Sequence, residues 1–521
     1  MKKRLLILLI VSVLSGAEEK NFLDVDEIKK GDRGYGLTTF IGSSIDTFYV
    51  EIIDILKGQG TGQDIILARL YGRDLEETGV ISGMSGSPVY VNGKIIGAVA
   101  YAWPFGKEPI CGITTFKDML NRDEKGVIEN VIPIKGILTL SGISRNEFID
   151  TIVHKLSLEV LPGGISDKEI EIKPGAPCGM VLAYGDAVLS VFGTLTYVKD
   201  GYIYAFGHPA FSGGNVRIPF SMGEVNAVFP SIYSSFKIVS PSKIIGSVVY
   251  DGKGGIIAKI GDKADVVEFV MRYGDEKRVY YITKEDFLLK NIFASFLYNN
   301  LLEFTGNSFE GSITGNFKFL TTSNDTFSYD IISSESPVRS LTMEAYYYLN
   351  FLSQNNIKKI EIKKIDVDIE KKPFKEFIIK DVVLNKEEYK PSEDIYIKII
   401  LERLRDNDTT IYLRLKSPKV EGEYIINVSS EREAYIEKER IIKNEKELIM
   451  YLKNIPEYKE ISVNINRMGE KFKQGEQIVN TTKKIIFKDG IESGYGIIEK
   501  KIMKMEGNVS GKKEIKINVR R

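Results

Sequence analysis

The sequence predicts a mainly β fold, with its strands gathered into small barrels or sandwiches. Short runs of apolar or alternating residues recur at regular spacing before residue 125 and again from 181 to 275. This spacing is typical of small all-β units. The chain also holds 27 Tyr and 26 Phe, together with many Ile and Val, which favour strands. Its 521 residues are enough for roughly two to four domains.

The N-terminal 17 residues have the pattern of a secretory signal peptide. Lys2, Lys3 and Arg4 form a basic start, residues 5–14 are apolar, and small residues follow at 15–17. The alternative is an uncleaved N-terminal anchor. We therefore expect an exported protein of the periplasm or cell envelope. The two cysteines, Cys111 and Cys178, could pair there or could be buried free thiols.

The first β unit is expected over residues 18–125. Residues 45–56 alternate as a strand does, and 64–70 form another short apolar run. Residues 88–101 predict a hairpin, because Asn92-Gly93 suits a type I′ turn between two apolar runs. A short helix is expected within residues 113–120, where the unit closes.

The rest of the chain is divided by changes in pattern. Residues 126–180 are expected to be a connector, with a helix at 147–156, that covers the groove between two units. A second β unit follows at 181–275. A mixed α/β region is expected at 276–375, with a helix at 285–302. Alternating strands at 376–521 predict a sandwich of the immunoglobulin type, with a helix at 445–452.

Composition argues against several kinds of partner. Lys and Arg number 71, as do Asp and Glu, so nothing in the charge indicates nucleic acid or an anionic surface. The chain has no GxxxxGK[ST] or HExxH pattern. Its two cysteines and two histidines lack the spacing of metal ligands. We expect no metal and no small-molecule cofactor.

The residues most suggestive of chemistry are Gly83-Met84-Ser85-Gly86-Ser87-Pro88. A serine nucleophile needs a tight bend that exposes its hydroxyl and leaves nearby backbone N–H groups free for an oxyanion. Gly83 and Gly86 permit such a bend. The alternative is a glycine-rich turn whose serines only cap the backbone.

A nucleophilic serine also needs a general base, usually histidine. His154 lies in an amphipathic run and is expected to be structural. His208 lies between Gly207 and Pro209 at the end of a predicted strand, a position that can fix an imidazole at a barrel rim. A turn histidine with a structural hydrogen bond is the alternative.

Two stretches resemble the SpoIVB-type serine peptidases, named for the stage IV B sporulation peptidase. Residues 78–99 are similar to that family's nucleophile block, and residues 193–208 resemble its histidine block. The resemblance covers about residues 30–260. It implies a chymotrypsin-like double β-barrel in which Ser85 is the nucleophile and His208 the base.

The chain departs from that family in two ways. Ser85 precedes His208 here, whereas the histidine block comes first in the sporulation peptidase, and no PDZ-like segment is evident. The position of the family's acid aligns near Tyr71 and is unmatched. Asp74 or Asp186 could orient His208 instead, and a Ser–His dyad is a further alternative.

The leading hypothesis is an exported serine endopeptidase that acts on a protein or peptide substrate. The N–H groups of Gly83 and Ser85 would hold the oxyanion. An added substrate strand would pair with Gly97, Ala98, Val99, Ala100 and Tyr101. The alternative is a non-catalytic binding or scaffold protein that associates with other cell-envelope proteins and retains the fold.

Overall fold

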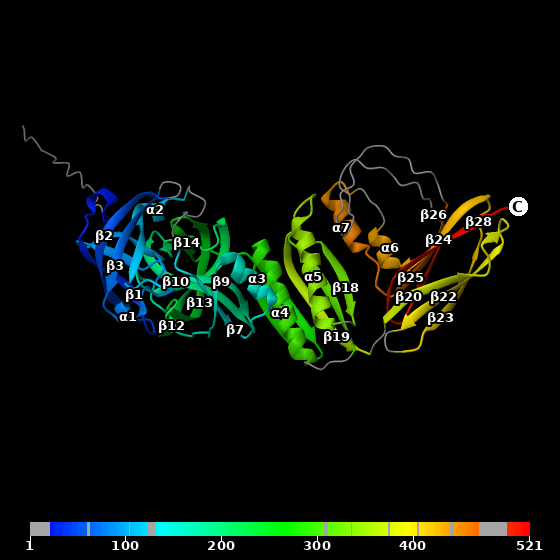
Figure 1. Cartoon of the computed structure of the whole chain (residues 1–521), viewed down its shortest axis with the longest axis horizontal. Coiled ribbons are helices and arrows are strands. Elements are labelled where there is room, and N and C mark those ends of the chain that lie inside the picture. The colour runs from blue at the N-terminus through cyan, green and yellow to red at the C-terminus, as the bar shows by residue number, and fades with distance from the viewer. Residues whose placement is uncertain are drawn as a thin grey trace, which may run out of the picture.

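The computed structural model describes residues 21–59, 63–103, 105–122, 132–306, 311–334, 336–373, 376–403, 406–437, 442–467 and 497–521. The expected signal peptide lies outside these residues. Figure 1 shows an elongated molecule with the N-terminal barrel at one end and the C-terminal strands at the other. Along its axis lie two β-barrels, a helix-covered sheet and a two-sheet unit. No helix in the described ranges has the length and apolar character needed to cross a membrane.

The first barrel is a closed ring of six strands in the order β1-β2-β3-β6-β5-β4. Its apolar core includes Phe48, Val89 and Val99. The expected hairpin forms from β4 and β5, with Asn92 and Gly93 both at positive φ. The elements of this unit are η1 Val25–Glu27, β1 Arg33–Thr39, β2 Ile45–Gln59, β3 Gln63–Tyr71, α1 Leu75–Thr78, β4 Pro88–Val91, β5 Lys94–Ala102, β6 Ile110–Thr115 and α2 Phe116–Leu120.

The second barrel is also closed, although it belongs to a larger sheet. Its six strands run in the order β9-β12-β13-β14-β11-β10, and β10 pairs back with β9. These strands are β9 Pro177–Gly185, β10 Val188–Lys199, β11 Tyr202–Ala205, β12 Gly214–Phe229, β13 Phe236–Gly252 and β14 Gly255–Ile260. The chain is therefore mainly β, with the double-barrel architecture implied by the resemblance.

The second barrel continues without a break into the region expected to be mixed α/β. Strand β16 pairs with the barrel strand β9, and the 13-stranded sheet extends from there through β15, β19, β17 and β18. Helix α4 is buried along most of its length and contacts both α3 and α5. The added elements are β7 Ile137–Ser141, α3 Glu147–Leu156, β8 Glu159–Pro162, β15 Val266–Tyr273, β16 Glu276–Thr283, α4 Asp286–Thr305, β17 Ser312–Thr321, β18 Thr326–Ser333, α5 Pro337–Gln354 and β19 Ile362–Lys372.

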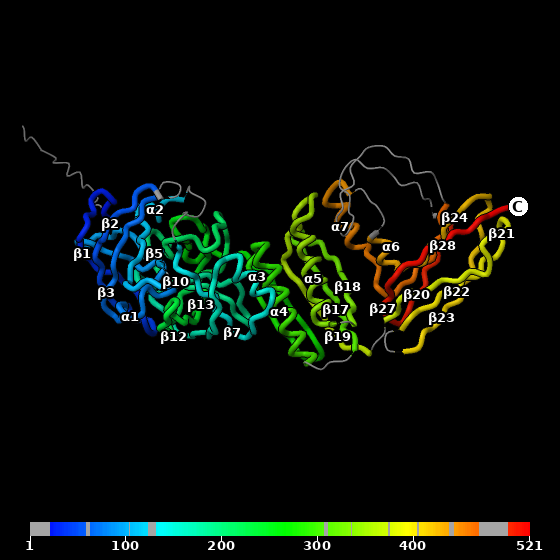
Figure 2. The backbone as a smooth tube through the Cα atoms, viewed as in Figure 1, coloured from blue at the N-terminus to red at the C-terminus, as the bar shows by residue number. Residues whose placement is uncertain are grey.

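The C-terminal unit is a sandwich of two sheets around one apolar core, which includes Ile397 from one sheet and Ile426 from the other. In Figure 2 the last strand, β28, lies beside β24 and β21, as their pairing requires. The immunoglobulin-like assignment stays a prediction. The strands are β20 Glu376–Leu384, β21 Glu388–Tyr389, β22 Asp394–Arg403, β23 Thr409–Lys416, β24 Gly422–Ser430, β25 Glu460–Arg467, β26 Ile497–Lys504, β27 Asn508–Ser510 and β28 Lys512–Val519.

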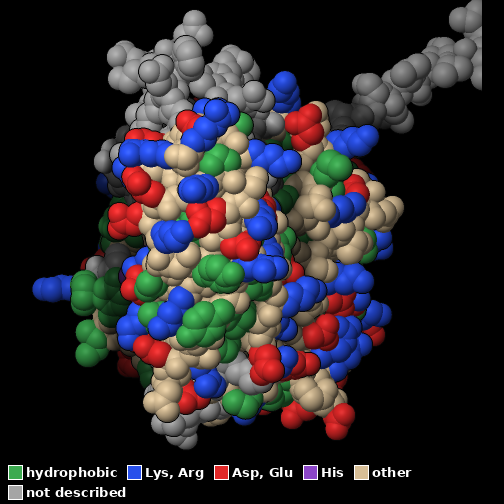
Figure 3. Space-filling view, turned by 90° about the vertical axis from the view of Figure 1, so that its right-hand side faces the viewer, with side chains coloured by type: hydrophobic (Ala, Val, Ile, Leu, Met, Phe, Trp, Pro, Cys, Tyr) green, Lys and Arg blue, Asp and Glu red, His purple; other side chains and the backbone are tan. Residues whose placement is uncertain are grey.

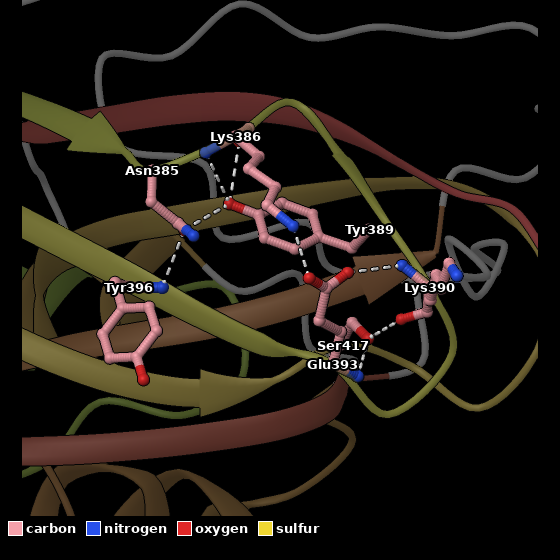
Figure 4. Close-up of polar contacts among 7 residues, drawn as sticks. All are labelled: Asn385, Lys386, Tyr389, Lys390, Glu393, Tyr396 and Ser417. Atoms are coloured by element: carbon pink, nitrogen blue, oxygen red, sulfur yellow. Dashed lines mark hydrogen bonds and ion pairs between the residues drawn. The ribbon is translucent and has the colours of Figure 1, made fainter.

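A polar network stabilises the turn between β20 and β22. The Tyr389 hydroxyl lies 2.8 Å from both Asn385 Oδ1 and Lys386 O, and it accepts a hydrogen bond from Lys386 N. Glu393 and Ser417 connect the same turn to the next strand (Figure 4). Figure 3, viewed onto the C-terminal end, shows Lys and Arg interspersed with Asp and Glu.

Two short helices, α6 Glu431–Glu437 and α7 Glu445–Lys453, lie in the chain between β24 and β25. Helix α6 contacts these two strands of the sandwich, and α7 packs on β18 of the helix-covered sheet. Leu448 and Leu452 of α7 join the large core of that sheet. Arg432, which is 2% exposed, places its guanidinium 3.9 and 3.8 Å from the ring centroids of Tyr329 and Tyr458. The sandwich is therefore anchored to its neighbour by buried contacts.

Candidate active site

Ser85 lies on a pair of consecutive tight turns. Met84 N–H donates to Ile81 O at 2.9 Å, and Ser87 N–H donates to Met84 O at 2.8 Å. The third residue of each turn is a glycine at positive φ, Gly83 at +99° and Gly86 at +92°, as a type II turn requires. A Cβ on Gly86 would lie 2.0 Å from Thr194 O, so no other residue fits there. The turn sequence thus fixes where the hydroxyl projects.

Strand β10 of the second barrel holds the carbonyl groups of this loop. Thr194 Oγ1 donates to Gly83 O at 2.9 Å, and Thr194 N–H donates to Ser85 O at 2.7 Å. Thr196 Oγ1 donates to Gly86 O at 2.6 Å. Because these three carbonyls point at β10, the loop needs the second barrel to hold its shape.

The N–H groups expected to form the oxyanion hole are available. Among the hydrogen bonds of the described residues, neither Gly83 N–H nor Ser85 N–H donates to another protein group. Nearly all backbone N–H groups away from water find a partner. Two free donors on the nucleophile loop are what a developing oxyanion needs.

His208 follows a sharp bend at the end of β11. Phe206 and Gly207 have φ of +74° and +71°, and positive φ is strained for a phenylalanine. Thr114 Oγ1 of the first barrel donates to Gly207 O at 2.5 Å. A Cβ on Gly207 would lie 3.2 Å from the Ala100 side chain, so the bend packs closely on β5.

The structure brings Ser85 and His208 together. Ser85 Oγ lies 2.8 Å from His208 Nε2, although 123 residues separate them in sequence, and each is 5% exposed. His208 Nδ1 lies 2.8 Å from Pro209 O. Because a carbonyl only accepts, Nδ1 carries the hydrogen, which leaves Nε2 to accept from the serine hydroxyl.

Burial lowers the pKa of His208 to about 4, with the hydrogen bond to Pro209 opposing the shift. The imidazole is therefore neutral at pH 7, the state in which it can take a proton. The pair has the protonation states and the contact that general-base activation of a serine requires.

Neither Asp74 nor Asp186 hydrogen-bonds to His208, because both ring nitrogens have other partners. Asp186 lies at the β9–β10 turn, where its Oδ2 accepts from Val279 N–H at 2.5 Å. Asp74 precedes α1 at positive φ. Of the arrangements considered from sequence, the geometry agrees with the Ser–His dyad.

A different carboxylate holds the loop after His208. Asp251, in β13, is fully buried and accepts from Ala210 N–H at 2.8 Å, Phe211 N–H at 2.7 Å and Gly213 N–H at 3.2 Å. Burial raises the pKa of its carboxyl group, against these hydrogen bonds. Asp251 thus fixes the path of the chain just beyond the imidazole.

A buried lysine lies beneath the nucleophile loop. Lys237, which is 2% exposed, runs its side chain along Gly83, where a Cβ would meet its carbons at 3.3 Å. Its Nζ donates to Thr38 Oγ1 at 2.6 Å, and Ser87 Oγ donates to the same oxygen at 3.0 Å. Burial lowers the pKa of Lys237 to about 7. The lysine links both ends of the loop to β1.

The strand expected to bind substrate is only partly open. Gly97 and Ala98 pair with β4 on one side and β6 on the other, and Val99 N–H donates to Ser87 O. A substrate strand cannot add at these three residues. The edge beyond them, at Ala100 to Ala102, carries residues 132–134 of the same chain.

Cys111 and Cys178 are buried free thiols, one of the two alternatives considered from sequence. Burial raises the pKa of both thiols. Across the described residues there is no cluster of three or more His, Cys, Asp or Glu side chains that could hold a metal ion.

Comparison with known proteins agrees with this geometry. Residues 18–120 match the family model described as SpoIVB peptidase S55. This part of the chain is therefore similar to a SpoIVB-type peptidase domain. The match spans the first barrel with Ser85 and ends before His208. No curated protein and no solved structure gives a significant match to the chain.

The structure brings together Ser85 and His208, which were singled out from the sequence. Asp251 was not singled out, and Lys237 was considered only in a chance-level Ser234-x-x-Lys237 pattern. A signal was present for Asp251, which begins the turn Asp251-Gly252-Lys253-Gly254-Gly255. Its role depends on a loop 40 residues earlier. Lys237 follows Phe236 at the start of a strand, and nothing in its neighbours indicates burial.

Proposed function

We propose that this protein is an exported serine endopeptidase with a Ser85–His208 dyad. The observation that carries the proposal is the 2.8 Å contact between Ser85 Oγ and a neutral His208 Nε2 beside two free backbone N–H groups. The S55 match over residues 18–120 supports a serine peptidase domain. Export rests on the signal-like pattern of residues 1–17.

In the acylation step, Ser85 Oγ attacks the scissile carbonyl carbon while His208 Nε2 takes the hydroxyl proton. The oxyanion accepts hydrogen bonds from Gly83 N–H and Ser85 N–H. The C–N bond then breaks as His208 gives its proton to the leaving amine. Water attacks the acyl-enzyme with His208 again as base, which returns Ser85 to its starting state.

Labelling with a fluorophosphonate probe tests this proposal directly, because the probe reacts with an activated serine. The purified protein should label, and Ser85→Ala should not label. His208→Ala should lower the labelling rate by roughly 10⁴- to 10⁶-fold, the scale of the loss when one triad member is removed. Thr139→Val, a buried substitution away from the site, is the control for folding.

The alternative is a cell-envelope binding or scaffold protein that keeps the peptidase fold. The observation that favours it is the lack of a carboxylate on His208, whose Nδ1 is bonded to Pro209 O. A folded wild-type protein that does not label, at any pH from 5 to 9, would favour this function over the first.

A further inference from the structure

A short segment of the chain lies on the open edge of the peptide-binding strand. We call residues 132–135 the strap. Ile134 N–H donates to Ala100 O at 2.9 Å, and Ala102 N–H donates to Ile132 O at 3.1 Å. Between these bonds Pro133 lies opposite Tyr101 in an antiparallel bridge. The strap is therefore an added strand of the kind by which sheet edges bind extended peptides.

Of the two strap residues that bond to β5, Ile134 is the one at the end of the pairing toward the nucleophile loop. Ala100, its hydrogen-bond partner, follows Val99, whose carbonyl accepts from Gly86 N–H beside Ser85. The Ala100 side chain also faces the bend before His208. A peptide in this register presents the residue at the Ile134 position to the nucleophile loop. Pro133 lies between these two hydrogen bonds, so its missing N–H forfeits neither of them.

The surroundings of the Ile134 side chain indicate which kind of substrate side chain fits at this position. It is 3% exposed and belongs to the apolar core of the first barrel. Beside it is a cleft of about 320 Å3, formed by the segment before the nucleophile, the ends of β5 and β6 and the tip of the β12–β13 hairpin. Val80, Ala102 and Ile110 are among its lining residues. Glu76, Lys107 and Glu108 also line the cleft, so it is the apolar core around Ile134 that suits a branched aliphatic side chain.

The strap is held firmly on its C-terminal side. Lys135 Nζ donates to Tyr233 OH at 2.9 Å and to Glu159 Oε1 at 3.2 Å, and it lies 4.7 Å from the centroid of the Tyr233 ring. Gly136 O accepts from Glu159 N–H, and β7 begins at the next residue. If the bond after Ile134 were attacked, the amine would stay in place and rejoin the acyl group.

We infer that the strap is an internal inhibitory occupant of the peptide-binding edge, and that the substrate is an extended peptide with a branched aliphatic residue before the scissile bond. This inference rests on the proposed peptidase function. Substrate must displace the strap. The apparent affinity for substrate is therefore the intrinsic affinity multiplied by the fraction of molecules in which the edge is open.

Two variants release the strap in different ways. Lys135→Met removes the charge contacts but keeps the side-chain length, and Ile134→Ala removes the apolar anchor. Ile137→Ala is the matched control, because Ile137 is 2% exposed and lies in β7 outside the pairing with β5. Hydrolysis of a quenched peptide containing Ile-Pro-Ile-Lys is measured beside fluorophosphonate labelling of Ser85.

A competing internal strand raises KM and leaves kcat unchanged. Lys135→Met should lower KM by about tenfold, the effect of losing one charge-assisted hydrogen bond from the closed form. Ile134→Ala should also lower KM, and Ile137→Ala should not. Equal KM values in all four proteins, with Ser85 labelled, would overturn the strap inference alone. No labelling in any of them would overturn the proposed function and the inference with it.

Two measurements on the unaltered protein complete the test. Acetyl-Ile-Pro-Ile-aldehyde, held on Ser85, should increase hydrogen exchange at the Ile134 amide, and unchanged exchange there would contradict displacement. A new N-terminus at Lys135 that Ser85→Ala abolishes would also contradict the inference, since the strap would then be a substrate.

Discussion

At the scale of single residues, burial sets the protonation state of the Ser85–His208 pair. Ser85 and His208 are each 5% exposed, so little water competes for their hydrogen bond. Burial disfavours the charged imidazole, and no carboxylate offsets that effect in this structure. His208 is therefore kept neutral by its surroundings, while the Pro209 carbonyl fixes which nitrogen carries the hydrogen.

The pH dependence of labelling follows from the same burial. With the pKa of His208 lowered to about 4, the base stays neutral through pH 5, and the labelling rate should fall only near pH 4. An exposed histidine would lose activity near its usual pKa of about 6.5. A half-maximal rate near pH 6.5 in a pH–rate profile would contradict the assignment of His208 as a buried base.

The free energy of unfolding should also depend on the protonation of His208. A folded pKa below the unfolded value means that the unfolded chain binds the proton first as pH falls. The contribution of His208 is complete above about pH 6.5 and is lost as pH falls toward about 4. His208→Gln should therefore flatten the fall in the free energy of unfolding across this window.

Burial of Lys237 predicts a second pH dependence of the free energy of unfolding. Its folded pKa, about 7, lies below the usual 10.5, so the unfolded chain binds more protons between these values. The free energy of unfolding should therefore rise as pH increases from 7 to 10. Lys237→Met removes the buried amine, and we expect a gain on the order of 2 kcal/mol at pH 7.

Urea unfolding at pH 7 and pH 9.5 measures both effects for Lys237→Met and wild type. The stability rise with pH should be smaller in the variant. Lys168→Met, at an exposed lysine paired with Glu224, is the control. A variant that is less stable at pH 7 would indicate that the contact with Thr38 outweighs the cost of burying the amine.

At the scale of elements, strand β10 shapes the nucleophile loop from across the barrel interface. Three carbonyls of the loop accept hydrogen bonds from Thr194 and Thr196. The peptide groups of these carbonyls carry the N–H groups of Met84, Gly86 and Ser87, so the bonds fix the peptide planes next to those of the free Gly83 and Ser85 N–H groups. In the proposed mechanism, β10 therefore helps to hold the oxyanion site.

Thr194→Val tests this role, because valine keeps the shape of the side chain and loses the hydroxyl that donates to Gly83 O. We expect labelling to slow by about tenfold and stability to fall by about 1 kcal/mol. Thr139→Val removes a hydroxyl of β7 that is just as buried. Equal losses of labelling in both variants would mean that Thr194 acts only through stability.

Some parts of this site could be predicted from sequence and others could not. Ser85 lies in a glycine-rich turn and His208 at the end of a strand. Both patterns are local, so the neighbouring residues alone were enough to predict these two positions. The roles of Asp251 and Lys237 depend on chain segments that meet only after folding. The hairpin at Asn92 and the helices α3, α4 and α7 were predicted because turn residues and apolar spacing act locally.

The second barrel and the region after it were predicted as separate units, whereas one sheet joins them. The connection is the pairing of β16 with β9, between residues such as Tyr281 and Tyr184. Pairing between strands so far apart in the sequence produces no local pattern from which it could be predicted. The connector was expected to cover the groove between two units; its residues 132–134 lie on β5, and residues 137–162 form β7, α3 and β8.

At the scale of the whole molecule, the sandwich is joined to the rest through α6, α7 and one buried cation. Arg432 lies between two tyrosine rings, donates to Asp330 O at 2.9 Å and lies 3.8 Å from Glu344. Because Tyr329 and Asp330 lie in β18 and Glu344 lies in α5 of the helix-covered sheet, the two units should unfold together.

Arg432→Ala should separate their unfolding. Loss of a buried cation with several partners costs about 3 kcal/mol, and we expect one calorimetric transition to become two. Arg414→Ala is the control, because Arg414 forms only an exposed ion pair with Asp394. A single transition in the Arg432 variant would show that the apolar contacts of α7 alone couple the units.

The order of the two barrels has a consequence for synthesis on the ribosome. The first barrel closes on itself, yet its serine meets its base only when a residue 123 positions later has been added. At about 5–20 residues per second, this interval is roughly 6–25 seconds. During that time the emerging barrel carries a serine without a base and a loop without β10. On the proposed function, hydrolysis can begin only once the second barrel has docked, so chains synthesised nearby meet a barrel that does not yet cleave them.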